Sequence, residues 1–167
     1  MNTDYENIPN NSYLKDTNNE LVPYLGIYKA NFQGKEITLF ITKEENKLTN
    51  RVNKQFYRDV LIVKYIIRNS SGLILQDTQN MNFQPEPKYY TIYSMITRPA
   101  LGDIVFNYRG TNCGIGWGKI ILKELSPTQL SWEYKPNSSL IDAATCPPGT
   151  DKKVYLPVTK DLIFTKQ

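Results

Sequence analysis

The chain has 167 residues, enough for one domain that buries roughly 70% of its unfolded surface and folds without a structural metal. Its 20 basic and 16 acidic residues give a net charge of +4, but the basic residues are scattered singly, so we expect no nucleic-acid partner. The apolar segment from Val60 to Ile67 is interrupted by Lys64 and is too short to span a membrane. There is no histidine, which excludes Ser-His-Asp and Cys-His catalysis and most transition-metal sites. We therefore expect neither a metal nor a cofactor.

Residues 1–20 are rich in asparagine and almost free of aliphatic side chains. Such a segment buries too little surface to offset the entropy lost on ordering. We expect a flexible polar leader or tether over 1–20, followed by a single domain over 21–167. A polar leader is typical of a chain whose signal or lipid-anchored segment has been removed, and equally of a flexible cytosolic terminus.

Short segments rich in β-branched and aromatic residues recur from Leu25 to Lys166, and turn residues separate them. Strands are predicted over 25–32, 35–43, 57–68, 73–79, 89–97, 103–109, 114–123, 129–134, 154–157 and 162–165. Alternation predicts that Ile37, Leu39 and Ile41 face inward, and that Tyr90, Ile92 and Ile96 do the same. The polar loop over 81–88 is a candidate rim or lid.

These segments predict an all-β fold, a single antiparallel up-and-down barrel of about 8 to 10 strands. The last strand is expected to pair with the first and close the barrel.

Cys113 and Cys146 are the only cysteines, and each lies beside turn residues. A disulfide between them would close a loop of about 33 residues and contribute roughly 3 to 4 kcal/mol. The alternative is two free, buried thiols in a reducing compartment. The sequence favours the disulfide and export.

Five aromatic residues fall at inward positions of the predicted strands and could line a ligand pocket or fill the barrel. Gly116 and Gly118 would leave a cavity beside Trp132 and Tyr134, or else allow close packing in a curved sheet. Arg98 or Arg109 would give a pocket a polar anchor. The candidate ligand-binding residues are Tyr28, Arg98, Phe106, Tyr108, Gly116, Gly118, Trp132 and Tyr134.

Trp117 falls on the outward face of its strand, with Lys119, Ile121 and Lys123. An exposed indole often marks contact with a sugar or a protein partner, so Trp117 is the candidate partner surface. Two facing carboxylates would permit glycoside hydrolysis. The acidic residues on or beside strands are Glu44, Asp59, Asp77, Asp103 and Glu133.

The segment Tyr24-Leu-Gly-Ile-Tyr28 and the hairpin that follows resemble the entry of lipocalin-like and calycin-like barrels, with Tyr28 in place of a tryptophan. The chain from Leu21 to Gln167 also resembles a group of small domains of unknown function from secreted or lipid-anchored bacterial proteins. This second likeness rests on Leu25-Gly-Ile-Tyr, Tyr57-Arg-Asp-Val-Leu, Leu130-Ser-Trp132 and the ending Leu162-Ile-Phe-Thr-Lys-Gln167. The resemblance implies a lipocalin-like fold and export and transfers no catalytic or binding residue.

The expectation is a non-catalytic exported binding module that holds a small apolar or aromatic ligand in the barrel or meets a protein partner at its surface. An alternative is a structural or protein-interaction domain with a filled core, and another is a carboxylate-based hydrolase. A secreted or periplasmic, outer-membrane-anchored bacterial protein is expected, with a possible lipid anchor on its precursor.

Overall fold

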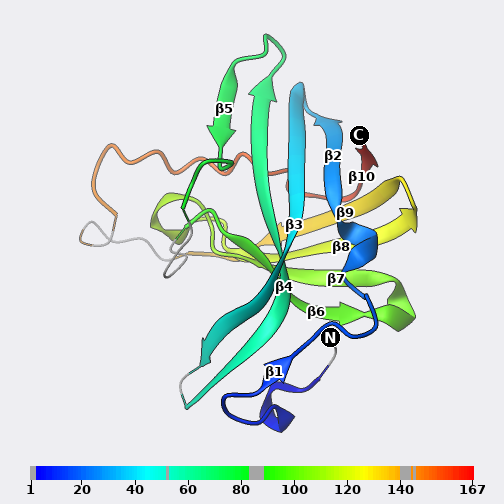
Figure 1. Cartoon of the computed structure of the whole chain (residues 1–167). Coiled ribbons are helices and arrows are strands. Elements are labelled where there is room, and N and C mark those ends of the chain that lie inside the picture. Colours follow the sequence, from blue (N-terminus) through cyan, green and yellow to red (C-terminus); the bar gives the residue numbers. More distant parts are fainter. Residues whose placement is uncertain (1–2, 52, 83–88, 140–143, 145) are drawn as a thin grey trace.

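A computed structural model describes residues 3–51, 53–82, 89–139, 144 and 146–167. Over this part of the chain the regular structure is ten strands and four 3-10 turns (Figure 1). The strands are β1 (Tyr13–Leu14), β2 (Gly26–Phe32), β3 (Lys35–Arg51), β4 (Lys54–Asn69), β5 (Ile74–Asp77), β6 (Ile92–Arg98), β7 (Asp103–Tyr108), β8 (Gly118–Ser126), β9 (Gln129–Pro136) and β10 (Thr159–Lys166). The turns are η1 (Tyr5–Asn7), η2 (Val22–Tyr24), η3 (Pro99–Leu101) and η4 (Asn112–Gly114). Within the described residues, no helix is long and apolar enough to cross a membrane.

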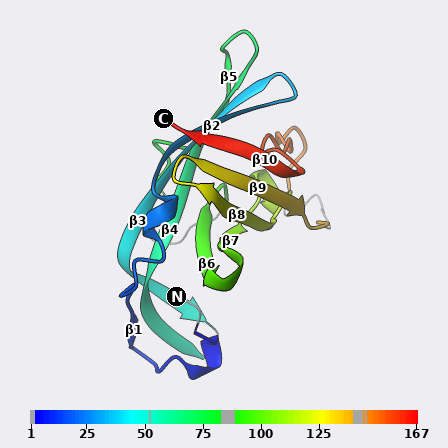
Figure 2. The same ribbon diagram turned by 90° about the vertical axis from the view of Figure 1, so that its right-hand side faces the viewer.

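Eight of the strands form a closed antiparallel barrel in the order β2-β3-β4-β6-β7-β8-β9-β10 (Figure 2). Each strand of the ring pairs with the next ring strand along the chain, with β5 skipped between β4 and β6, and β10 returns to β2 with Thr165 opposite Lys29. The predicted up-and-down barrel, including its closure by the last strand, is confirmed. Strands β1 and β5 lie outside the ring, and both pair with β4.

The barrel forms because alternate residues of each strand are apolar and can be buried together on one face of the sheet. Ile37, Leu39 and Ile41 of β3 are at most 2% exposed, as the alternation predicts. Thr42, which follows Ile41 and points to the opposite face, is exposed. Inward residues from all eight strands make one continuous core.

The inward set predicted for β6 is wrong after its midpoint, because β6 and β7 shift register between Ser94 and Ile96. An extra residue in one strand turns the following side chains to the opposite face. Ser94 and Thr97 are therefore buried, while Ile96 is only half-buried. Tyr90 lies outside the strand with φ of 62°, and only Ile92 of the predicted set joins the core.

One further predicted strand is wrong. Residues 154–157 do not form a strand, although Leu156 is buried in the core. The loop predicted as a rim or lid over 81–88 lies largely outside the described residues, which here include only Met81 and Asn82.

The barrel closes at a narrow seam between β4 and β6, where the register pairs only Ile62 with Tyr93 and Val63 with Ile92. By contrast, β3 and β4 stay paired from Lys35 opposite Asn69 to Arg51 opposite Lys54. The same edge of β4 also receives β1 at Tyr57 and β5 beyond Ile66. Three short partners thus share one long strand.

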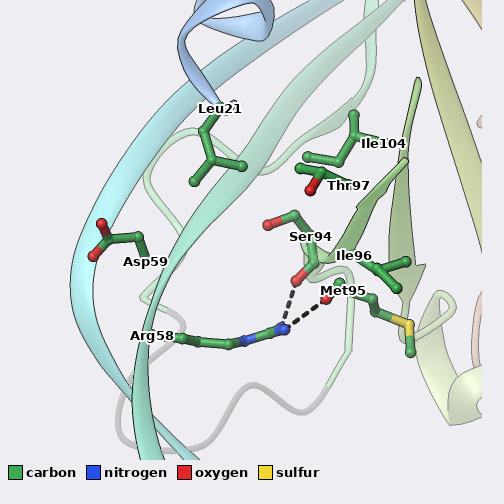
Figure 3. A pocket seen from close by; sticks show the side chains of 8 residues that line it. All are labelled: Leu21, Arg58, Asp59, Ser94, Met95, Ile96, Thr97 and Ile104. Carbon is green, nitrogen blue, oxygen red and sulfur yellow. Dashed lines mark hydrogen bonds between the residues drawn. The ribbon is translucent and has the colours of Figure 1, made fainter. Parts of the chain in front are cut away.

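Side chains extend the seam where the backbones separate (Figure 3). The Arg58 guanidinium donates to the carbonyl oxygens of Met95, at 2.7 Å, and Ser94, at 2.5 Å. The backbone N–H of Leu61 donates to the Ser94 hydroxyl at 2.9 Å. β4 and β6 are therefore joined over more residues than their ladder alone would join.

The segment expected to be a tether is instead packed along the seam over residues 13–24, named here the N-terminal strap. Its β1 pairs in parallel with β4, and Leu21 is 1% exposed between β4 and β6 (Figure 3). Composition misses this arrangement because the contacts are mainly polar. Asp16 accepts hydrogen bonds from the backbone N–H groups of Glu20 and Leu21 at 2.9 and 3.1 Å.

Asp59 of β4 holds the N-terminal strap in place and is fully buried. Its carboxylate accepts hydrogen bonds from the Tyr13 hydroxyl and from the N–H groups of Asp16 and Asn46, and Lys43 Nζ lies 3.4 Å away. Burial raises the pKa of Asp59, but these hydrogen bonds and the lysine outweigh burial and hold that pKa below its usual value.

Asp59→Asn should lower the free energy of unfolding by about 2 to 3 kcal/mol, because an amide nitrogen would face donors that now share a carboxylate. A lowered folded-state pKa gives stability that is present above the ordinary Asp value of about 3.9 and is lost as the pH falls through the folded value. Urea denaturation should therefore show the largest difference between the two proteins near pH 7, narrowing below about pH 4.

The exposed Asp161→Asn variant is the control. A loss below about 0.5 kcal/mol for Asp59→Asn, typical of a surface substitution, would contradict the assigned role of Asp59.

Candidate functional site

The aromatic side chains predicted to line a ligand pocket fill the barrel. Each is at most 1% exposed: Tyr28, Phe106, Tyr108, Trp132 and Tyr134. A space large enough for a ligand would leave accessible surface on the residues around it. The rings instead pack against one another: Trp132 lies 5.6 Å from Phe164 and 6.3 Å from Tyr134 between ring centroids.

The polar ends of these rings are also occupied. Trp132 Nε1 donates to the carbonyl oxygen of Pro157 at 2.9 Å, and the Tyr134 hydroxyl donates to the carbonyl oxygen of Gly116. The hydroxyls of Tyr65 and Tyr108 lie 3.5 Å apart. Burial raises the pKa of Tyr65, Tyr108 and Tyr134, so all three stay neutral well above physiological pH.

Gly116 and Gly118 permit close packing and leave no open space. A Cβ at Gly116 would lie 2.6 Å from Val154 Cγ2 and 2.9 Å from the Tyr134 hydroxyl, and Gly116 also has φ of 74°. A Cβ at Gly118 would lie 2.9 Å from the carbonyl oxygen of Lys135. Of the two interpretations of these glycines, the structure favours close packing.

The predicted polar anchors do not reach the interior. Arg98 forms a two-pronged ion pair with Asp103, at 2.7 and 2.8 Å. Arg109 is exposed. The ligand-binding candidates thus divide into a packed interior set and one structural ion pair, and the structure does not bring Arg98 into a pocket with the aromatic residues.

A small recess at the seam lies between Leu21, Arg58, Asp59, Ser94, Thr97 and Ile104 (Figure 3). It has no room for a water molecule. Arg58 Nε is buried there without a hydrogen-bond partner, and burial lowers the pKa of Arg58 to about 10. The guanidinium therefore stays charged at neutral pH, and its hydrogen bonds go to the β6 carbonyl oxygens at the seam.

Outside the barrel, a disulfide joins the loop before β8 to the loop before β10. Cys113 and Cys146 are bonded, as predicted, with Cα atoms 5.5 Å apart, and Cys146 is 3% exposed. Asn112 Nδ2 also donates to the carbonyl oxygen of Asp151 at 2.9 Å, which adds a second tie between the two loops. A disulfide fits an oxidising, exported location.

Trp117 follows this crosslinked loop and is 46% exposed, in agreement with its predicted outward position. Its backbone oxygen accepts from the N–H of Asn137 at 2.8 Å, and its indole Nε1 donates to the carbonyl oxygen of Ser138 at 3.3 Å. These two bonds fix the indole edge against the end of β9. The indole is held in place, and nearly half of the residue's surface stays open.

Two lysines lie near Trp117 and were not identified from the sequence as a pair. Lys119 of β8 is directly opposite Lys135 of β9, and both are exposed. Neither has a carboxylate within 4.0 Å in the described part of the chain. Like charges directly opposite across a sheet are unfavourable. Alternation places Lys119 beside Trp117, but only the strand register brings Lys135 to them.

Trp117, Lys119, Lys135, Asn137 and Ser138 are named here the Trp117 surface. This set combines an indole held by a hydrogen bond with two cations that have no carboxylate within 4.0 Å among the described residues. It can bind a negatively charged group together with a flat or apolar one.

The acidic residues considered for hydrolysis are separated or already paired. Asp59 is buried, Asp103 pairs with Arg98, Glu44 pairs with Lys47 at 3.0 Å, and Glu133 lies 4.0 Å from Lys160. Asp77 accepts from the N–H of Gln79 at 2.7 Å. Among the described residues there is no group of three or more His, Cys, Asp or Glu side chains placed to hold a metal ion.

No protein-family model matches the chain, and neither a curated protein nor a solved structure shows significant similarity to it.

Reduction of the disulfide should lower the free energy of unfolding by about 3 to 4 kcal/mol, because it releases a constraint on the unfolded chain across a separation of 33 residues. Urea denaturation with and without dithiothreitol measures this change. A Cys113→Ser, Cys146→Ser double variant is the control and should be insensitive to the reductant. Equal stability of the oxidised and reduced protein would show that the bond does not stabilise the fold.

Proposed function

We propose that this chain is a non-catalytic binding module that uses its outer surface, with the Trp117 surface as the contact site for a protein partner that carries acidic groups. The observation that carries the proposal is the combination of a filled barrel with a half-exposed tryptophan fixed beside two unpaired lysines. Tryptophan is enriched at the energetic centres of protein interfaces, because its large face is desolvated at little cost in conformational entropy.

The charge of the partner follows from Lys119 and Lys135. Two cations held opposite each other repel one another until an anion lies between or above them. An acidic segment would relieve this repulsion while an apolar side chain covers Trp117. Both lysines are exposed, so salt will screen the electrostatic part of the binding.

A binding role without catalysis is supported by the chemistry of the site. The chain has no histidine, and the Trp117 surface contains no carboxylate or thiol that could act as base or nucleophile. The buried acids are engaged in structural hydrogen bonds, and the pKa of Asp59 is lowered, which is unfavourable for a general acid.

The same module would work outside the cell or in the periplasm, where the Cys113–Cys146 bond persists. The resemblance to domains of secreted or lipid-anchored bacterial proteins supports this location, including a lipid anchor on the precursor. In the alternative, a small ligand inside the barrel, a bound molecule would have to displace packed rings such as Trp132 and Tyr134.

Trp117→Ala should weaken binding of an envelope partner by at least about tenfold, as for an interface hot spot. Lys119→Gln with Lys135→Gln should weaken it comparably and flatten its salt dependence. The test is retention of envelope proteins on the immobilised chain, followed by affinity measurement with each retained protein.

Two matched controls are available. Leu125→Ala removes a similarly exposed apolar side chain, 47% exposed, from the same strand. Lys15→Gln with Lys35→Gln removes the same charge from positions outside the Trp117 surface and its neighbouring strands. Partners retained equally by the Trp117→Ala protein and the control proteins would contradict the proposal.

A further inference from the structure

A second candidate site lies at the far end of the β3–β4 hairpin. Both strands run beyond the last residue paired with β2, where Gly26 is opposite Ile41, and they form an arm that ends at Arg51 opposite Lys54. Figures 1 and 2 show this arm projecting from the barrel with β1 beside it. An open hollow of about 350 Å³ lies at its end. Its lining residues, named here the arm tip, are Asn10, Asn50, Arg51, Asn53, Lys54 and Gln55.

The arm tip carries two cations without an acidic partner. Arg51 and Lys54 are directly opposite in the register, and no carboxylate lies within 4.0 Å of either in the described chain. The other lysines of the arm are paired, Lys43 with Glu45 at 3.1 Å and Lys47 with Glu44 at 3.0 Å. The tip therefore carries two cations that no described carboxylate neutralises, whereas Arg58, the other such cation of the described arm, is engaged with the carbonyl oxygens of β6.

An aromatic ring from the N-terminal segment positions both cations. The Arg51 guanidinium lies 5.6 Å and Lys54 Nζ 5.1 Å from the centroid of the Tyr5 ring. Lys54 Nζ also donates to the carbonyl oxygens of Tyr5 and Glu6, at 3.3 and 3.0 Å. Tyr5 in turn packs on the buried Phe56, with centroids 6.0 Å apart. The two charges are thus arranged before any ligand arrives.

Amide groups provide the rest of the lining. Asn10 Oδ1 accepts from the N–H of Gln55 at 2.9 Å, and Gln55 Nε2 donates to Asn11 Oδ1 at 2.7 Å, which fixes these two side chains. The side-chain amides of Asn50 and Asn53 make no hydrogen bond within the described chain. They offer donors and acceptors to a ligand that has hydroxyl groups.

We propose that the arm tip binds an acidic saccharide. Arg51 and Lys54 hold its carboxylate or sulfate group, and Asn50 and Asn53 hydrogen-bond its ring hydroxyls. The hollow is open to solvent, as suits a site that holds one end of an extended chain at the surface. None of the lining residues is apolar, which favours a hydroxyl-rich ligand over a lipid surface, where inserted apolar side chains would be expected. The site is independent of the Trp117 surface.

The test is calorimetric titration of the whole chain with a short oligogalacturonate, its fully methyl-esterified form and inorganic phosphate. The acidic oligosaccharide should bind, and the neutral ester should bind at least about tenfold more weakly, because it lacks the charge. Arg51→Gln with Lys54→Gln should abolish the difference between the two oligosaccharides. Asn50→Ala with Asn53→Ala should weaken both, since it removes contacts to the sugar and not to the charge.

Lys35→Gln with Lys160→Gln, which removes equal charge away from the arm, should leave binding unchanged, as should Trp117→Ala. The proposal is overturned if no oligosaccharide binds or if the arm-tip variants bind as the unchanged chain does. It is also overturned if phosphate binds as tightly as the oligogalacturonate, or if only phosphatidylglycerol vesicles bind. Thermal denaturation of each variant confirms that it is folded.

Discussion

The barrel depends on its closure between β4 and β6, where the backbone ladder is shortest. Arg58 and Ser94 make this closure possible: one donates to two carbonyl groups of β6, and the other accepts the N–H of Leu61. A buried guanidinium is costly to desolvate, and an arginine is suited to the position because its several donors can reach carbonyl groups that no opposing strand satisfies. The N-terminal strap then covers the same seam, with Leu21 inserted and Asp59 binding β1 and the arm of β3.

Closure of the seam determines where the protein can act. With the ring shut, inward residues from eight strands form one buried core, and Trp132 and Tyr134 bond to backbone carbonyls rather than to a ligand. Only the outer surface of the barrel is then open to a binding partner. There the described residues include two places where opposed cations have no carboxylate within 4.0 Å, Lys119 with Lys135 and Arg51 with Lys54. Sheets normally avoid such pairs, and their retention where aromatic rings and amides also gather supports a binding role.

Most of the barrel could be predicted from the sequence because alternation is a local property of each strand. Alternation correctly placed Leu39, Phe106 and Trp132 inside and Trp117 outside. It failed where a non-local feature intervenes: the bulge in β6 reverses Ile96, and pairing with β4 extends β3 through a polar stretch to Arg51. The N-terminal strap was missed because its anchor, Asp59, lies far away in the chain. The pairs Lys119–Lys135 and Arg51–Lys54 are brought together only by the strand register, which the sequence does not reveal. The sequence therefore predicted only part of each candidate site.

The central claim is that the barrel is filled and that binding occurs outside it. Native mass spectrometry of the purified protein, before and after incubation with a lysate extract and followed by denaturation, tests this claim most directly. The account predicts the mass of the oxidised polypeptide alone, with no apolar small molecule released when the protein unfolds. A retained apolar compound that leaves only on denaturation would show that the core opens around a ligand, and would contradict the account.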